Sequence, residues 1–108
     1  MKIIDYQTSG GKNVIKTFTD KLPEVQRTEI LDVRQEISEH GLDAFEKLNT
    51  RQLRGKLWEI KISQNRVMYV IINQDAVAFL HICKKQKGKA EKFEIDKAEK
   101  RAKREGLM

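Results

Sequence analysis

The spacing of apolar residues changes near residue 56, and this change predicts how the chain folds. Before it, apolar residues recur at helical intervals, which predicts helices over about 12–20 and 23–40. Pro23 suits the first turn of the second helix, and Gly41 suits the left-handed residue that often follows a helix. Lys2–Tyr6 alternates weakly and predicts a short strand, whereas 42–55 is expected to be a connector with one helical turn near Asp43–Leu48.

An alternation with period two begins at Lys56 and predicts three consecutive strands. The expected strands are 56–63, 65–73 and 76–84, joined by turns so short that neighbouring strands run antiparallel. In the first strand Trp58, Ile60 and Ile62 share a face, which the two helices should cover. A final helix is predicted over 91–105. The predicted fold is therefore α+β: a small, mostly antiparallel sheet with two N-terminal helices and a C-terminal helix.

The composition predicts one folded domain with no membrane segment. A chain of 108 residues suits a single domain, expected to span 1–108. Its longest apolar run, Val67–Ile72, is far shorter than the roughly 20 residues that a bilayer requires. Cys83 is the only cysteine, which excludes an internal disulfide and a cysteine-rich zinc site. These features predict a cytoplasmic protein with no membrane partner, no metal and no cofactor.

Positive charge is concentrated in the second half of the chain. Residues 1–55 hold nine basic and nine acidic side chains, whereas residues 56–108 hold thirteen and seven, so this half carries the whole net charge of +6. The excess is densest in a segment called here the lysine tract, which comprises Lys84, Lys85, Lys87 and Lys89. A one-sided positive field attracts polyanions, so the predicted ligand is a nucleic acid, in the first place RNA. The alternative is a solvated loop that only aids solubility.

The strands carry the residue types that RNA cleavage without a metal requires. Phosphate-binding glycine loops, nucleophile elbows and His/Cys metal clusters are absent from the sequence. Metal-free cleavage needs a base for the 2′-OH, cations for the charge that grows on the phosphate, and an acid for the leaving oxygen. Glu59 and His81 are the candidates for proton transfer. The candidate cations are Lys56, Lys61, Arg66 and the lysine tract.

Plainer interpretations of the same residues stay open. His81 alternates with Phe79 and Cys83 and could be a half-buried strand residue on their face of the sheet. Glu59 and Lys61 could form a surface ion pair with each other. Trp58 and Tyr69 are expected in the core rather than as platforms for bases.

The order of the segments resembles the RelE/ParE superfamily of bacterial type II toxins, and within it the phage-derived HigB-like branch. The resemblance rests on the run LRGKLWEIKI at 53–62, RVMYV at 66–70, LHICKKQK at 80–87 and a closing helix at 94–104. It implies a RelE-like fold and a toxin that inhibits translation as a ribosome-dependent mRNA endoribonuclease. The implied partners are the ribosome with its mRNA and a cognate antitoxin, in this branch usually a helix-turn-helix protein.

The resemblance also implies roles for individual residues. Lys61 and Arg66 match the positions that hold the scissile phosphate in such toxins, and the stretch Lys84–Lys87 matches a later cationic position. Where RelE-type enzymes have a tyrosine early in the last segment, the nearest aromatic residue here is Phe93. Two other functions fit the same surface: a non-enzymatic, ParE-like inhibitor of DNA gyrase, and a plain RNA-binding module.

Overall fold

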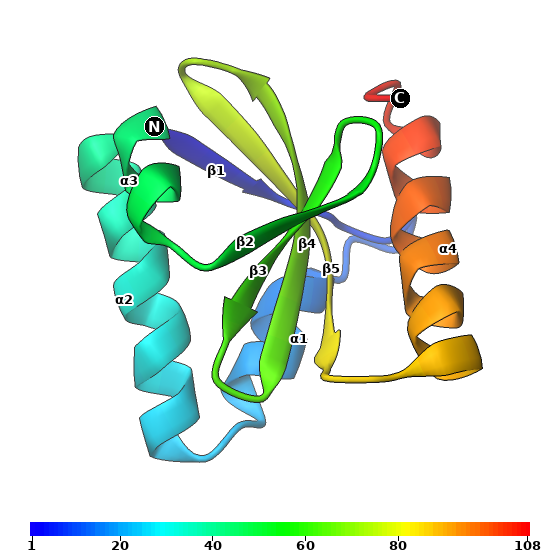
Figure 1. The fold of residues 1–108 in the computed structure, drawn as a ribbon, viewed down its shortest axis with the longest axis horizontal. Helices are drawn as coiled ribbons and strands as arrows, with labels where there is room; N and C mark the ends of the chain where they lie inside the picture. The colour runs from blue at the N-terminus through cyan, green and yellow to red at the C-terminus, as the bar shows by residue number, and fades with distance from the viewer.

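The computed structural model describes residues 1–108 and places every strand in one sheet (Figure 1). The strand order is β1-β5-β4-β3-β2, with β1 parallel to β5 and all other neighbours antiparallel. The helices and strands, in chain order, are β1 (Lys2–Asp5), α1 (Val14–Asp20), α2 (Glu24–His40), α3 (Leu42–Lys47), β2 (Thr50–Arg54), β3 (Leu57–Ile62), β4 (Asn65–Asn73), β5 (Ala76–Lys84) and α4 (Gly88–Arg104). The predicted α+β class and the three-strand meander are confirmed.

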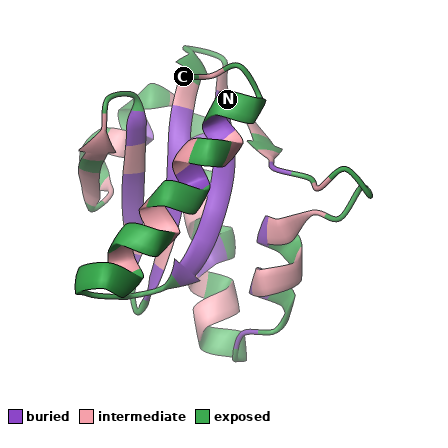
Figure 2. Ribbon diagram, turned by 90° about the vertical axis from the view of Figure 1, so that its right-hand side faces the viewer, coloured by how far each residue is buried: buried purple, intermediate pink, exposed green.

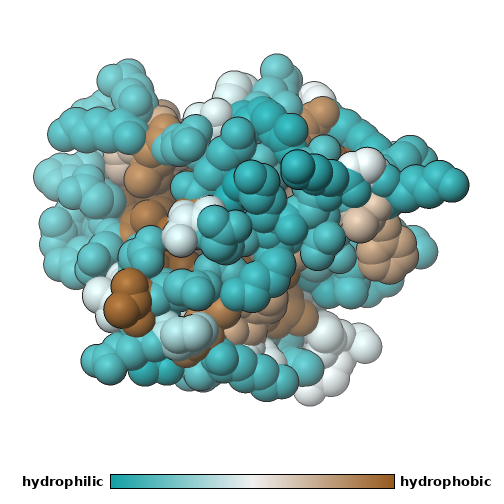
Figure 3. Space-filling model, turned by 60° about the horizontal axis from the view of Figure 1, so that its bottom comes forward, coloured by the Kyte–Doolittle hydropathy of each residue, from teal (hydrophilic) through white to brown (hydrophobic).

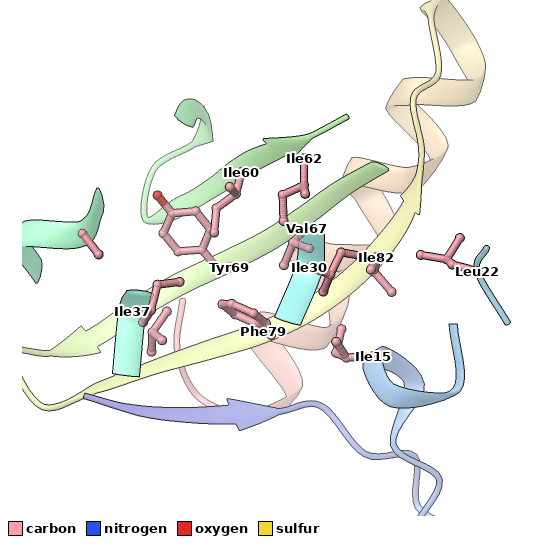
Figure 4. Close-up of a cluster of buried hydrophobic side chains, with 12 residues drawn as sticks. Ile15, Leu22, Ile30, Ile37, Ile60, Ile62, Val67, Tyr69, Phe79 and Ile82 are labelled. Atoms are coloured by element: carbon pink, nitrogen blue, oxygen red, sulfur yellow. The ribbon is translucent and has the colours of Figure 1, made fainter. Parts of the chain in front are cut away.

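The first three helices cover one face of the sheet. Ile60, Ile62 and Tyr69 from the strands pack there against Ile30 and Ile37 of α2, all of them buried (Figure 4). Trp58 packs against the edge of this cluster, so the expected core roles of Trp58 and Tyr69 are confirmed. Burying such side chains is the main favourable term in folding.

Helix α4 covers the opposite face, which makes the molecule three layers deep (Figure 2). Ala98 and Ala102 are fully buried where α4 packs on the sheet, against a cluster that includes Leu57, Met68 and Leu80. Their small side chains allow the helix to approach the strands closely. The helix begins at Gly88, three residues before the predicted start.

Two edge strands and one helix start differ from the sequence prediction. Residues 50–54 were expected in a connector but form β2, which pairs with β3. The segment is polar and lies at the sheet edge, so no run of buried side chains marks it. The parallel pairing of β1 makes the sheet mixed. Pro23 is the N-cap of α2 rather than part of its first turn, whereas Gly41 ends α2 with positive φ as predicted.

None of the helices combines the length and the apolar character needed to cross a membrane.

Candidate functional site

A β-bulge in β5 determines which side chains face α4. Met68 of β4 pairs with His81, and the next residue, Tyr69, pairs with Phe79, so Leu80 has no partner on β4. An extra residue reverses the alternation of the side chains that follow it. Phe79 therefore lies in the core under α2, whereas Cys83 lies in the core under α4. The expectation that Phe79, His81 and Cys83 share a face is wrong because of this bulge.

His81 is buried beneath α4 and is held by two charged residues of that helix. Its Nε2 lies 2.6 Å from Oε2 of Glu94, and its Nδ1 lies 3.0 Å from a guanidinium nitrogen of Arg101. Because arginine can only donate, Nδ1 accepts and Nε2 carries the proton given to Glu94. Burial lowers the pKa of His81, and Arg101 and Lys97 add to this, although Glu94 opposes them. The ring is therefore a neutral, oriented imidazole at pH 7.

His81, Cys83 and Glu94 also form the one group whose donor atoms converge as metal ligands do, all within 4.8 Å of one another. Burial, with the carboxylates of Glu94 and Glu59 nearby, raises the pKa of the Cys83 thiol to about 12. A metal would need the thiolate and a free lone pair on Nε2, which Arg101 at Nδ1 disfavours. With Nε2 and the thiol both protonated, the three side chains are better suited to proton transfer than to metal binding.

Glu59 is buried on β3, and Arg51 of the neighbouring strand β2 balances its charge. Its Oε2 accepts from Nε of Arg51 at 3.0 Å, and the same guanidinium reaches Glu91 of α4 at 3.1 Å. The alternative in which Glu59 pairs with Lys61 is therefore wrong, because the partner of Glu59 is Arg51, on the edge strand that the sequence analysis missed. In this conformation the carboxylate is closed off from bulk water, with only 1% of Glu59 exposed.

Lys61 and Arg66 lie side by side next to the β3–β4 turn, at one end of the sheet. They are direct partners across β3 and β4, and Arg66 pairs in turn with Cys83 of β5. A guanidinium nitrogen of Arg66 donates to the carbonyls of Ser63 and Asn65 at 2.9 Å, which orients it over the β3–β4 turn. In Figure 3 this end of the molecule comes forward, and hydrophilic side chains cover most of it.

The other predicted cations are distributed between two ends of the molecule. Lys84 lies at the same end as Arg66 and donates to Gln26 of α2 at 3.2 Å, while the rest of the lysine tract is exposed in the loop before α4 and in its first turn. Lys56 lies in the β2–β3 turn, five residues before Lys61 along a strand, which places it about 16 Å away. Lys56 is therefore separate from the Lys61–Arg66 pair.

The family described as "Phage derived protein Gp49-like (DUF891)" matches residues 17–103, most of the chain. The chain belongs to the Gp49-like family. No curated protein matches it.

A solved structure supports the same fold for this Gp49-like protein. The chain is similar to the one titled "Crystal structure of archaeal RelE-RelB complex from Pyrococcus horikoshii OT3", with a TM-score of 0.61 and 18% identity. The match covers 81% of this chain and 97% of that one. The family match confirms the predicted membership of a phage-derived family. The solved structure confirms the predicted RelE-like fold.

The structure of this Gp49-like protein adds site residues that the sequence analysis missed. Glu94 and Arg101 hold His81, and Arg104 donates to the hydroxyl of Tyr6 at 2.8 Å. Arg101 also stacks over the Tyr6 ring, 4.7 Å from its centroid. Glu94 and Arg101 lie seven residues apart, on either side of the buried Ala98. They therefore share the face of α4 that packs on the sheet, and this helical spacing could have identified them from the sequence.

Proposed function

We propose that this Gp49-like protein is the toxin of a type II toxin-antitoxin system and that it cuts mRNA on the ribosome, as HigB-like and RelE-like toxins do. The observation that carries the proposal is the Lys61–Arg66 pair at the hydrophilic end of the sheet. Two cations fixed by strand pairing form a preorganised site for one phosphate, and the lysine tract follows directly on β5. The family and the RelE-like fold support this assignment.

The proposed chemistry uses cations first and proton transfer second. Arg66 and Lys61 stabilise the charge that grows on the phosphate as the 2′-oxygen attacks, the step at which fixed cations contribute most. His81, neutral and oriented, is the group that takes or returns a proton. Glu59 can take part only if Arg51 releases it, so its role in proton transfer is the weaker assignment.

The proposed partners are the ribosome, its mRNA and a cognate antitoxin, in the cytoplasm. The similar archaeal RelE was solved in complex with RelB. By analogy, a neighbouring gene should encode an antitoxin of the helix-turn-helix type. This antitoxin should cover the end of the sheet that carries the Lys61–Arg66 pair. Co-expression of that product should restore growth; if no neighbouring product binds the chain, the toxin assignment fails.

A ParE-like inhibitor that binds DNA gyrase without cutting RNA is the second candidate. The burial of both proton-transfer candidates favours it: His81 is 6% exposed and Glu59 only 1%. A protein that acts by binding needs the cationic surface and does not need these groups to reach a substrate.

Induction in bacterial cells, with the 5′ ends of mRNA mapped, separates the two candidates. The enzyme produces new 5′ ends inside translated codons and in reading frame. The gyrase inhibitor leaves messages intact and produces broken or stalled DNA. If induction neither cuts messages nor damages DNA, and growth is unchanged, both assignments are contradicted. The remaining interpretation is then a plain RNA-binding module.

A further inference from the structure

A groove between α1 and α4 runs along the edge of β5 beyond the point where β1 ends. β1 pairs with β5 only as far as Phe79, and α1 lies beside the remaining residues, with α4 on their other side (Figures 1 and 2). Two adjoining cavities form the groove, of about 300 Å³ and about 240 Å³, and they share Lys97 and Arg101. His81 and Ile82 line the first.

The groove is lined by cations and by no acidic side chain. Six basic residues line it: Lys12, Lys21, Lys97, Lys100, Arg101 and Arg104. The four lysines have neither an ion pair nor a side-chain hydrogen bond. The two arginines form hydrogen bonds only with neutral groups, and Glu94 is the one carboxylate that attracts Arg101. Cations that outnumber their anionic partners in a concave site focus a positive field.

The acidic side chains of α4 that pair with β2 lie on one side of the helix, and its groove cations lie on the other side. Glu91, Asp96 and Glu99 lie toward β2, where Arg51 and Arg54 neutralise them. The hydrogen bond from Arg54 holds the pKa of Asp96 below its usual range. On the same side, Lys92 pairs with Asp96 and Lys103 with Glu99. The cations on the side toward α1 have no such partners.

We infer that the α1–α4 groove is a second RNA-binding site, which holds the sugar-phosphate backbone of a strand beyond the Lys61–Arg66 pair. Lys97 and Arg104 are seven residues apart, about 10 Å along the helix, so the groove is long enough for more than one phosphate. The choice of RNA rather than another polyanion rests on the proposed function. The lining offers positive charge and little that could read a base, so we expect binding that is independent of sequence.

The test compares two pairs of exposed lysines on the same helix. Lys97→Ala with Lys100→Ala removes two groove cations, and Lys92→Ala with Lys103→Ala removes two ion-paired cations from the other side, so both variants have the same net charge. The probe is a fluorescent single-stranded 2′-O-methyl RNA, which cannot be cut through its 2′-oxygen. Binding to the full chain is followed by anisotropy over a range of salt concentrations.

The groove variant should bind about tenfold more weakly, with a salt slope smaller by about 1.4 for two lost phosphate contacts, while the control stays within about twofold of the original chain. Equal losses in both variants would mean that only net charge matters, and an unchanged groove variant would mean that RNA binds elsewhere; either result overturns the inference. Because this RNA cannot be cleaved, a failure here is distinct from a failure of the proposed ribonuclease activity.

Discussion

His81 is the residue whose environment departs most from its expected one, because it is enclosed by charges of α4 rather than half exposed on a strand. Its pKa lies below the ordinary value of about 6.5, chiefly through burial. As pH falls from about 7 to 5, the unfolded chain takes up the proton first, so the free energy of unfolding should fall over this range. In His81→Asn this part of the pH dependence should disappear in urea denaturation measured across the same range.

The other histidine provides the control for this measurement. His40 ends α2 with its side chain about half exposed, near Glu36 and Glu39. His40→Asn should keep the decline seen in the original chain. If His81→Asn keeps the same pH dependence as the original chain, the ring is not buried in neutral form.

Cys83 is expected to be an unreactive thiol. Burial, with the nearby carboxylates of Glu94 and Glu59, raises its pKa to about 12, so almost no thiolate forms near pH 8. Alkylation by iodoacetamide at that pH should be slow in the folded protein and become fast when urea unfolds it. Equal rates in both states would contradict the position of Cys83 under α4.

At the scale of elements, the close packing of α4 on the sheet depends on two alanines. Ala98 and Ala102 are fully buried, so Ala98→Leu or Ala102→Leu should overpack the layer and lower the free energy of unfolding by about 1–3 kcal/mol. Ala90→Leu, in the exposed first turn of α4, should change it by less than about 0.5 kcal/mol. Urea denaturation of the three variants measures this, and equal stabilities would place α4 elsewhere.

The elements predicted best from sequence are those with a regular buried face. The meander and α2 carry apolar residues at constant intervals, so their bounds agree with the structure to within a residue or two. β2 was missed because Thr50–Arg54 is a polar edge strand with no such interval. The bulge at Leu80 was missed because it depends on the pairing of β4 with β5, which local spacing does not reveal.

The candidate site was predictable only in part, because local spacing in the sequence does not reveal contacts between distant segments. Lys61 and Arg66 follow from strand register, since a short turn fixes which residues face each other. The partners of Glu59 and His81 come from Arg51, Glu94 and Arg101, far away in sequence. Such long-range pairs arise from the packing of α4 and β2 on the sheet, and the sequence pattern contains no direct sign of them.

At the scale of the whole molecule, the positive charge lies on separate surfaces, one of which is the exposed lysine tract. If it contacts RNA, replacing Lys84, Lys85 and Lys87 together by alanine should reduce the salt slope of RNA binding by about 2. The slope is measured as the logarithm of the binding constant against the logarithm of salt concentration. An unchanged slope would identify the tract as a solvated loop.

The most direct test of the account is cleavage of a defined mRNA on purified ribosomes, read by primer extension. We predict a cut within the codon in the ribosomal A site that requires ribosomes and no added metal beyond what the ribosomes need. Arg66→Ala should slow cutting by about 10²–10³, because one cation that stabilises the transition state is lost. Lys47→Ala, an exposed change in α3 on the other face of the sheet, should leave the rate unchanged. An intact message with the original chain, or full activity in Arg66→Ala, would contradict the account.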